Sequence, residues 1–132
     1  MAIRSQVLDK KASLTYALFM TLRPITVFET QMFARAAEAI WSDDERSALI
    51  DFVARNPENG DLIPGTGGVR KLRWGRTGSG KRGGARVIYF FYNLDKPLYM
   101  LLAYAKSGAV DMTPDEKRAV SAFAAIIKGG LR

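Results

Sequence analysis

Two apolar segments separated by only three residues place the strongest constraint on how this chain folds. Residues 85–93 and residues 97–106 are rich in Val, Ile, Tyr, Phe and Leu, a composition typical of the central strands of a sheet. The connection between them, residues 94–96, has the length of a hairpin loop. Together with a third strand predicted over residues 69–76, this spacing predicts a small antiparallel sheet.

The region before these strands is predicted to be mainly helical. A short strand is expected over residues 25–30, and a helix over residues 31–41, where apolar side chains recur with helical spacing. Ser42 and Glu45 then form a capping box, which predicts a second helix that runs to Arg55. The two helices are therefore expected to form an αα-hairpin with almost no loop.

A second capping box predicts the last helix. Thr113 and Glu116 supply the box, Pro114 occupies the first helical position, and the glycine pair at residues 129–130 ends the helix. The predicted order is β-α-α-β-β-β-α. We therefore expect an α+β domain in which the N-terminal αα-hairpin and the C-terminal helix pack on one side of a small antiparallel sheet.

The domain is expected to cover residues 25–132. We expect residues 1–24 to be a dispensable or disordered extension, or the product of an early start codon, with Met20 as the true beginning. The apolar run at residues 14–22 is far shorter than the roughly 20 residues that a membrane span needs. No small-residue cleavage site follows that run. We therefore expect a cytoplasmic protein without a membrane partner.

The chain contains neither His nor Cys, and its net charge is +7 from 20 Lys and Arg against 13 Asp and Glu. The missing residue types exclude a disulfide framework, a thiolate zinc site, a thiol nucleophile and a His-based catalytic site. An enzyme of this composition would move protons through Lys, Tyr, Asp, Glu or a substrate phosphate. We expect no metal and no cofactor. The net charge favours a polyanionic partner.

The positive charge is concentrated in one segment. Residues 1–60 carry seven basic residues against eight acidic ones, whereas residues 61–112 carry nine against three. Residues 69–86 contain seven basic residues and no acid: Arg70, Lys71, Arg73, Arg76, Lys81, Arg82 and Arg86. Because like charges repel, such a cluster favours a negatively charged ligand such as a phosphodiester.

Alternation along the strands predicts which side chains share a face of the sheet. Lys71 and Arg73 share one face of the first basic strand, and Arg70 and Trp74 share the other. On the last strand, alternation groups Met100, Leu102, Tyr104 and Lys106. A concave sheet would bring together Lys71, Arg73, Arg86 and Lys106. The expected additional contacts to nucleic acid are Arg70, Arg76, Lys81, Arg82 and Trp74, the last through base stacking.

A near match to a phosphate-binding loop lies between the first two strands of the predicted basic sheet. Residues 75–81 satisfy the spacing G-x-x-x-x-G-K, but Arg82 stands where Ser or Thr should bind Mg²⁺. A strand, rather than a helix, is predicted after it. The sequence therefore excludes nucleotide hydrolysis and leaves a glycine-rich cationic hairpin loop.

Three segments occur in order along the chain: residues 65–74 (GTGGVRKLRW), residues 80–89 (GKRGGARVIY) and residues 101–106 (LLAYAK). Together with the helix entry at residues 111–116, they resemble the RelE/ParE toxin superfamily, and in particular its HigB-like branch. The resemblance covers roughly residues 25–130. It implies the RelE-like microbial ribonuclease fold and a toxin of a type II toxin–antitoxin system.

The resemblance further implies a ribosome-dependent, metal-independent mRNA endonuclease, or mRNA interferase, that inhibits translation. In this chemistry a ribose 2′-OH attacks the adjacent phosphate. Carried over to this chain, Lys71 and Arg73 are the basic pair, one accepting the 2′-OH proton and the other holding the phosphate. Arg86 would stabilise the transition-state charge. Either Tyr104 or Lys106 would protonate the leaving 5′-oxygen.

The chain departs from the family pattern in two ways that leave the identity of the acid open. Ser107 stands where some RelE-type enzymes have another Arg, and no Tyr follows Tyr104. The implied partners are mRNA, the ribosome and a cognate antitoxin of the helix-turn-helix, HigA-like type, which alone would contact operator DNA. Two alternatives remain: a ParE-like toxin that inhibits DNA gyrase without nuclease activity, and a non-toxic basic nucleic-acid-binding homologue.

Overall fold

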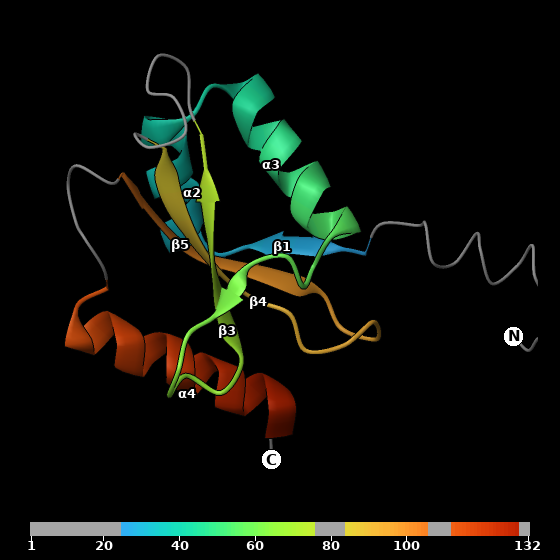
Figure 1. Cartoon of the computed structure of the whole chain (residues 1–132), viewed down its shortest axis with the longest axis vertical. Helices are drawn as coiled ribbons and strands as arrows, with labels where there is room; N and C mark the ends of the chain where they lie inside the picture. The colour runs from blue at the N-terminus through green and yellow to red at the C-terminus, as the bar shows by residue number, and fades with distance from the viewer. Residues whose placement is uncertain (1–24, 76–83, 106–111, 130–132) are drawn as a thin grey trace, which may run out of the picture.

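The computed structural model describes residues 25–75, 84–105 and 112–129 of the chain. The elements in this part are shown in Figure 1. In chain order they are β1 (Val27–Glu29), α2 (Gln31–Ile40), α3 (Asp43–Arg55), β2 (Asp61–Leu62), β3 (Val69–Trp74), β4 (Ala85–Phe90), β5 (Leu98–Ala105) and α4 (Pro114–Gly129).

The strands form one five-stranded sheet in the order β1-β5-β4-β3-β2. The antiparallel pairing of β3, β4 and β5 confirms the predicted hairpins. Two features differ from the prediction. Strand β1 pairs with β5 in parallel, and β2 adds an edge strand of two exposed residues, which is too short to produce a sequence pattern. The α+β class is confirmed, with one more strand than predicted.

Both predicted capping boxes are present. Ser42 accepts a hydrogen bond from the Glu45 amide, while the Glu45 carboxylate accepts one from the Ser42 amide. Thr113 and Glu116 make the same reciprocal pair at the start of α4. Each box satisfies two amides that the first helical turn leaves without an internal partner, so the helices begin where the sequence predicts.

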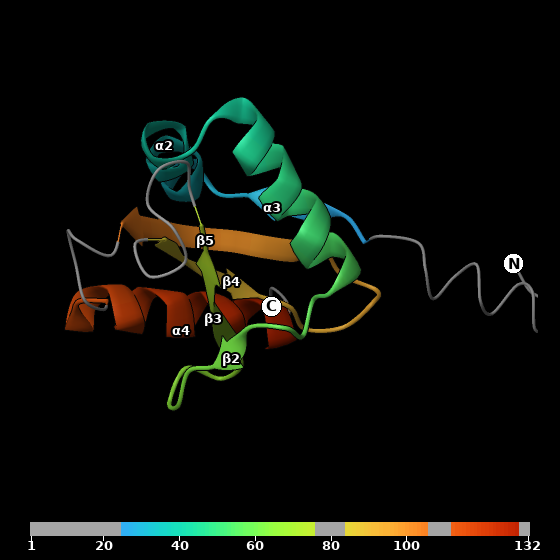
Figure 2. The same cartoon turned by 45° about the horizontal axis from the view of Figure 1, so that its top comes forward.

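The helices cover both faces of the sheet, which corrects the expectation that all of them pack on one side. Helices α2 and α3 lie on one face and α4 lies on the other (Figure 2). The two faces accordingly have separate cores. On the α2–α3 face, side chains such as Phe33, Leu49 and Val87 are fully buried. On the α4 face, Ile88 and Phe90 pack against Val120 and Ala124.

The physical reason for this correction lies in β4. Four successive residues, 87–90, are buried, because the strand has a helix on each side. A continuous apolar run is typical of a strand that is covered on both faces. Apolar side chains of α2, α3 and α4 reach these two cores, either buried or partly buried.

A β-bulge in β5 changes which side chains share a face. The register with β4 shifts between Ile88 and Tyr89, so that Ile88 pairs with Leu102 while Tyr89 pairs with Met100. Leu101 is the extra residue, and both Leu101 and Leu102 belong to the core under α4. Met100 therefore packs on the α2–α3 face, away from Leu102 and Tyr104, which corrects the grouping that simple alternation predicts.

The loop before β2 is held to the α2–α3 face by a buried tyrosine. The Tyr89 hydroxyl donates to the Pro57 carbonyl over 2.9 Å and accepts from the Gly60 amide over 2.8 Å. A Cβ at Gly60 would lie 2.9 Å from the Tyr89 ring, so glycine permits this close approach. Burial raises the pKa of the Tyr89 hydroxyl above its ordinary value of 10.0.

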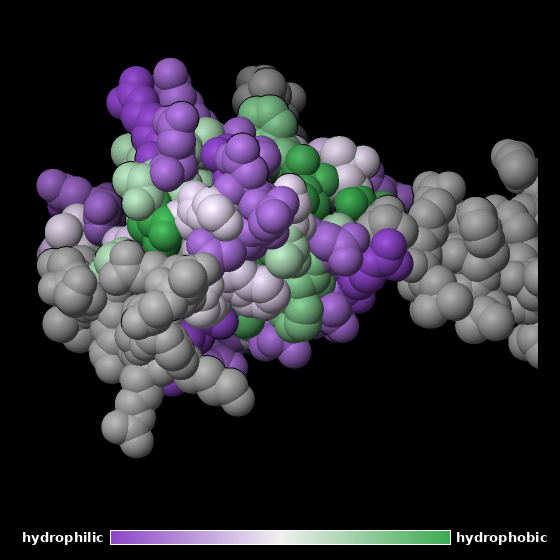
Figure 3. Space-filling view, turned by 90° about the horizontal axis from the view of Figure 1, so that it is seen from above, coloured by the Kyte–Doolittle hydropathy of each residue, from purple (hydrophilic) through white to green (hydrophobic). Residues whose placement is uncertain are grey.

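The surface on the α2–α3 side is mostly hydrophilic, with separate hydrophobic patches (Figure 3). Among the helices of residues 25–75, 84–105 and 112–129, none combines the length and the apolar character required to cross a bilayer.

Candidate anion site on the sheet

Three cations and a tyrosine meet on the α4 face of the sheet. In the strand register Arg73 lies directly opposite Arg86, and Arg86 lies directly opposite Tyr104. Lys71 lies two residues before Arg73 on the same face of β3. Paired residues share a face, and so do alternate residues of one strand. We call Lys71, Arg73, Arg86 and Tyr104 together the cation face.

The cation face begins where helix α4 stops covering the sheet. Along β3, Val69 is fully buried in the core under α4, Lys71 is half-buried and Arg73 is exposed. This gradient places the three side chains of one strand face progressively further from the hydrophobic core. The cations are therefore held by a rigid sheet and yet open to a ligand from solvent.

The pairing of Arg73 with Arg86 is electrostatically unfavourable by itself. Directly opposite residues of an antiparallel pair have Cα atoms about 4.5–5.5 Å apart, and like charges at that position destabilise a sheet. A negatively charged ligand between the two guanidinium groups would reverse the sign of this interaction. The arrangement therefore fits a site that is completed by an anion.

Arg86 also carries an unmet hydrogen-bond donor. Its Nη1 atom is buried and has no hydrogen-bond partner within the described part of the chain. A buried donor without a partner costs about 1–3 kcal/mol. Because a guanidinium group binds phosphate oxygens in a planar, two-pronged geometry, a phosphate would satisfy this donor together with the charge.

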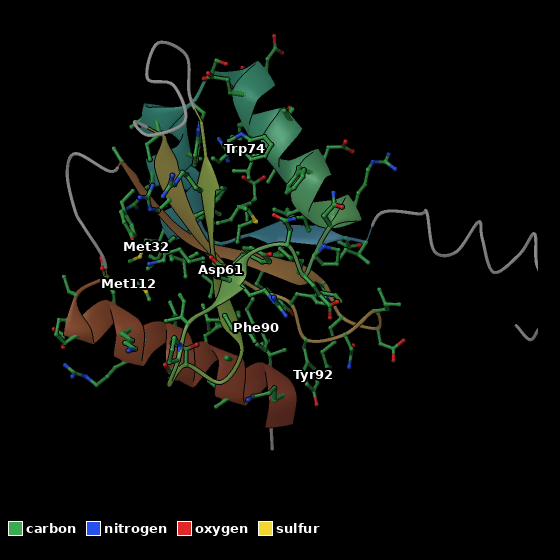
Figure 4. All side chains as sticks on the ribbon, in the orientation of Figure 1. Met32, Asp61, Trp74, Phe90, Tyr92 and Met112 are labelled. Carbon is green, nitrogen blue, oxygen red and sulfur yellow. The ribbon has the colours of Figure 1, made fainter. Side chains whose placement is uncertain are left out.

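Two of the predicted nucleic-acid contacts lie on the opposite face. Arg70 donates from Nη1 to the carbonyls of Glu58 and Gly60, over 3.0 and 2.8 Å. Trp74 packs against Phe52 of α3, with ring centroids 5.2 Å apart, and it lies on the α3 side of the sheet in Figure 4. The structure therefore does not bring these two side chains together with the cation face.

Four other predicted contacts cannot be placed on this face. Arg76, Lys81, Arg82 and Lys106 lie outside the described residues, as does most of the segment that resembles a phosphate-binding loop. The structure does describe Gly75, on which that segment begins, and Gly84, which lies three residues after it ends. The Trp41 indole donates to the Gly75 carbonyl over 3.0 Å, and a Cβ at Gly84 would lie 2.7 Å from the Trp74 carbonyl oxygen.

Sequence reasoning missed one feature of this side of the sheet, which is an apolar groove lined by Leu101 and Leu102 of β5 and by residues of α4. The groove depends on the β5 bulge, because the bulge turns Leu101 to the same side as Leu102. No residue type in β5 indicates a bulge, so the alternation of apolar residues along the strand does not predict the groove. Among residues 25–75, 84–105 and 112–129, no three acidic side chains gather into a group that could hold a metal ion.

Comparison with known proteins supports the arrangement of elements described above. A solved structure of a double arginine-to-alanine mutant of the E. coli toxin RelE in the free state is similar to this chain, with a TM-score of 0.50. The likeness covers 83% of this chain and 100% of that one at 12% sequence identity, which shows a shared fold. The family model described as the RelE toxin of the RelE/RelB toxin–antitoxin system matches residues 25–130. Because this match spans most of the chain, the protein belongs to the RelE toxin family.

Proposed function

We propose that the chain is a ribosome-dependent mRNA endonuclease that inhibits translation, with the cation face as its active site. Membership of a toxin–antitoxin family already implies a cognate antitoxin. The observation that carries the finer proposal is the buried, unpartnered Nη1 of Arg86, flanked across the sheet by Arg73 and Tyr104. A phosphodiester supplies the oxygens and the negative charge that this arrangement lacks.

The two arginines act on the scissile phosphate. Arg86 satisfies its free donor on one phosphate oxygen, and Arg73 approaches from the neighbouring strand. When the 2′-oxygen attacks, the phosphorus becomes five-coordinate and the phosphate gains negative charge. Two fixed guanidinium groups stabilise that added charge more strongly than they stabilise the ground state, so they lower the barrier.

The protons are transferred by Lys71 and by either Tyr104 or Lys106. Lys71, as the neutral amine, accepts the 2′-OH proton and becomes an ammonium group. Arg73 cannot take this proton, because a guanidinium group keeps its own proton throughout. The bond from phosphorus to the 5′-oxygen then breaks, and Tyr104 or Lys106 donates the proton to that oxygen. The products are a 2′,3′-cyclic phosphate and a free 5′-OH.

The partners follow from this reaction. The substrate is mRNA bound to a translating ribosome in the cytoplasm. The three sequence segments that resemble the HigB-like branch favour an antitoxin of the helix-turn-helix, HigA-like type, which would join the toxin to operator DNA. The net charge of +7 is consistent with an approach to ribosomal RNA, because association with a polyanion is accelerated by opposite charge.

A reconstituted translation reaction tests the proposal. Adding the full-length chain should arrest translation and cut the bound message, leaving cyclic phosphate and 5′-hydroxyl ends. A message with a 2′-deoxynucleotide at the mapped cut position should resist cleavage there, because the attacking oxygen is gone. Uncut message in arrested reactions would contradict the proposal.

Parallel assays separate the two alternative functions. Loss of DNA supercoiling by purified gyrase, with intact mRNA, would identify the ParE-like activity. Harmless expression with RNA binding that weakens steeply with salt would identify a binding protein without toxicity.

A further inference from the structure

The end of the β3–β4 hairpin carries the two arginines on which the proposed active site depends. Arg73 lies opposite Arg86 in the second-last pair of the register. Residues 75–84 connect the two strands, and a connection of this length does not fix the register in the way that a two-residue turn does. Strand ends open more readily than strand centres, and like charges push these two side chains apart. The hairpin end therefore needs support from elsewhere in the fold.

Helices α2 and α3 supply that support from the opposite face of the sheet. The indole N–H of Trp41 donates to the Gly75 carbonyl over 3.0 Å, one residue beyond the end of β3. The Trp74 ring packs against Phe52 of α3, and Figure 4 shows Trp74 on the α3 side of the strand. The end of β3 is thus attached to the helices by one hydrogen bond and one ring contact.

Trp41 is itself fixed at the junction of the two helices. It is the residue at which α2 ends, its amide donates to the Ala37 carbonyl, and the next residue, Ser42, caps α3. Its side chain is buried, and its ring centroid lies 6.4 Å from that of Phe33. Both helices therefore hold the indole, and a group on a rigid scaffold positions its partner more precisely than a group on a loop.

The place of the acceptor distinguishes this bond from an ordinary core contact. A buried indole N–H usually finds some acceptor, so the bond alone does not assign a role. Gly75, however, lies two residues after Arg73, and a shift of its carbonyl would move the strand end that carries this guanidinium group. Catalysis by fixed charges depends on their placement, so such a shift would slow cleavage.

We infer that Trp41 is a positioning residue of the proposed active site. Its indole N–H holds the Gly75 carbonyl and keeps the end of β3 in the register that sets Arg73 opposite Arg86, against the repulsion between them. Trp41 acts from the opposite face of the sheet and does not touch the RNA. The effect on cleavage rests on the proposed function, whereas the effect on the strand end does not.

Amide hydrogen exchange in the full-length chain, followed by NMR, tests the anchor without RNA. Trp41→Phe removes the indole N–H and keeps an aromatic ring. Losing one hydrogen bond should speed exchange of the protected amides in residues 72–74 and 85–86 by about three- to tenfold relative to those of residues 98–102. Tyr89→Phe is the matched control, since it removes a hydrogen-bonding group from the same face at the loop before β2. It should leave that ratio unchanged.

A double variant tests whether the anchor opposes the repulsion. Arg73→Gln removes one of the two like charges, so adding it to Trp41→Phe should return exchange at the strand end toward the wild-type rate. Unchanged exchange in the double variant would contradict the part of the inference that concerns repulsion.

Single-turnover cleavage on programmed ribosomes separates positioning from a loss of folded protein. In Trp41→Phe the rate at saturating concentration should fall by about ten- to a hundredfold, while the half-saturating concentration stays within about twofold of the wild type. A variant that is only less stable loses cleavage in proportion to its unfolded fraction, which circular dichroism measures at the assay temperature. Tyr89→Phe should cleave at close to the wild-type rate per folded molecule.

Three results would overturn the inference. They are wild-type exchange at the strand end of Trp41→Phe, an equal rise in exchange throughout the sheet, or a wild-type cleavage rate in this variant despite faster exchange. If Trp41→Phe does not fold, the wild type decides: its Trp41 indole proton should exchange as slowly as the strand-end amides, and exchange as fast as in a free peptide would overturn the inference.

The two measurements also separate this inference from the proposed function. If the wild-type chain cut no message, the proposed function would fail and the positioning role with it. Hydrogen exchange would still decide whether Trp41 holds the end of β3.

Discussion

The two faces of the sheet each hold a partly buried arginine, and the two arginines have opposite surroundings. Arg70, on the α2–α3 face, donates to two backbone carbonyls of the loop before β2. Arg86, on the α4 face, lies opposite another arginine. Each guanidinium group has one buried donor without a partner in the described residues, Nε in Arg70 and Nη1 in Arg86, so the difference lies in the carbonyls that Arg70 binds and in the like charge that Arg86 faces. The first arginine serves the fold. The second is placed at a cost to the fold, which indicates a ligand.

The same contrast extends to the tyrosines. Tyr89 connects two backbone groups of the chain through its hydroxyl and is fully buried. Tyr104 is only half-buried and lies opposite Arg86 in the strand register. Substitutions on the two faces should therefore affect different properties, which allows the comparison to be tested.

The largest effect is expected for Lys71→Ala. Removing the group that accepts the 2′-OH proton should reduce the rate of mRNA cleavage by about 10²–10⁴-fold, with little change in melting temperature. The rate is measured in single-turnover reactions on programmed ribosomes. Lys117→Ala, which removes an exposed cation of α4, is the control and should cleave at the wild-type rate. Equal rates for wild type and Lys71→Ala would remove Lys71 from the site.

The next largest effect is a loss of stability, expected for a substitution on the α2–α3 face. Tyr89→Phe removes a hydroxyl that pairs with Pro57 and Gly60, and it should lower the free energy of unfolding by about 1–3 kcal/mol. Urea denaturation measures the change. Cleavage per folded molecule should stay within twofold of the wild type, and a much larger loss would link this face to catalysis.

The raised pKa of Tyr89 adds a pH dependence to the same variant. A hydroxyl whose pKa is higher in the folded chain stabilises the fold fully below the unfolded value of 10.0, and that stability is lost as pH rises through the folded pKa. The wild type should therefore lose stability above about pH 10 more steeply than Tyr89→Phe. If the free energy of unfolding changed equally with pH in the two proteins from pH 8 to 11, the Tyr89 hydroxyl would not be the cause of the pH dependence.

The smallest expected effect is a gain in stability, opposite in sign to the loss expected for Tyr89→Phe. Arg73→Gln removes a like charge opposite Arg86, so it should raise the free energy of unfolding by about 0.2–1 kcal/mol while it weakens cleavage. Arg35→Gln, at an exposed position of α2, should leave stability unchanged. A loss of stability in Arg73→Gln would mean that repulsion between Arg73 and Arg86 does not destabilise the fold.

Much of the fold could be predicted from local signals in the sequence. Ser42 with Glu45, and Thr113 with Glu116, mark helix starts through hydrogen bonds within four residues, so they can be recognised without knowledge of the tertiary structure. The β4–β5 pairing follows from a short connection. The position of α4 on the second face was missed, although the run of buried residues 87–90 in β4 carries that information.

The candidate site was predicted in part. Alternation correctly separated Lys71 and Arg73 from Arg70 and Trp74, but the count of positive charges still included Arg70 among the nucleic-acid contacts. A charge count cannot reveal that Arg70 binds two carbonyls of its own chain. The apolar groove lined by Leu101 and Leu102 could not be predicted, because the register shift that turns Leu101 toward α4 depends on the pairing of whole strands.

The most direct test compares Arg86→Ala with Arg70→Ala for both cleavage rate and melting temperature. The account predicts that Arg86→Ala loses about 10²–10³-fold in mRNA cleavage and does not lower the melting temperature, because it removes a like charge opposite Arg73 and a buried donor without a partner in the described residues. Arg70→Ala should melt at a lower temperature and cleave normally per folded molecule. If Arg86→Ala cleaves at the wild-type rate, or if Arg70→Ala alone loses cleavage while folded, the α4 face is not the active face.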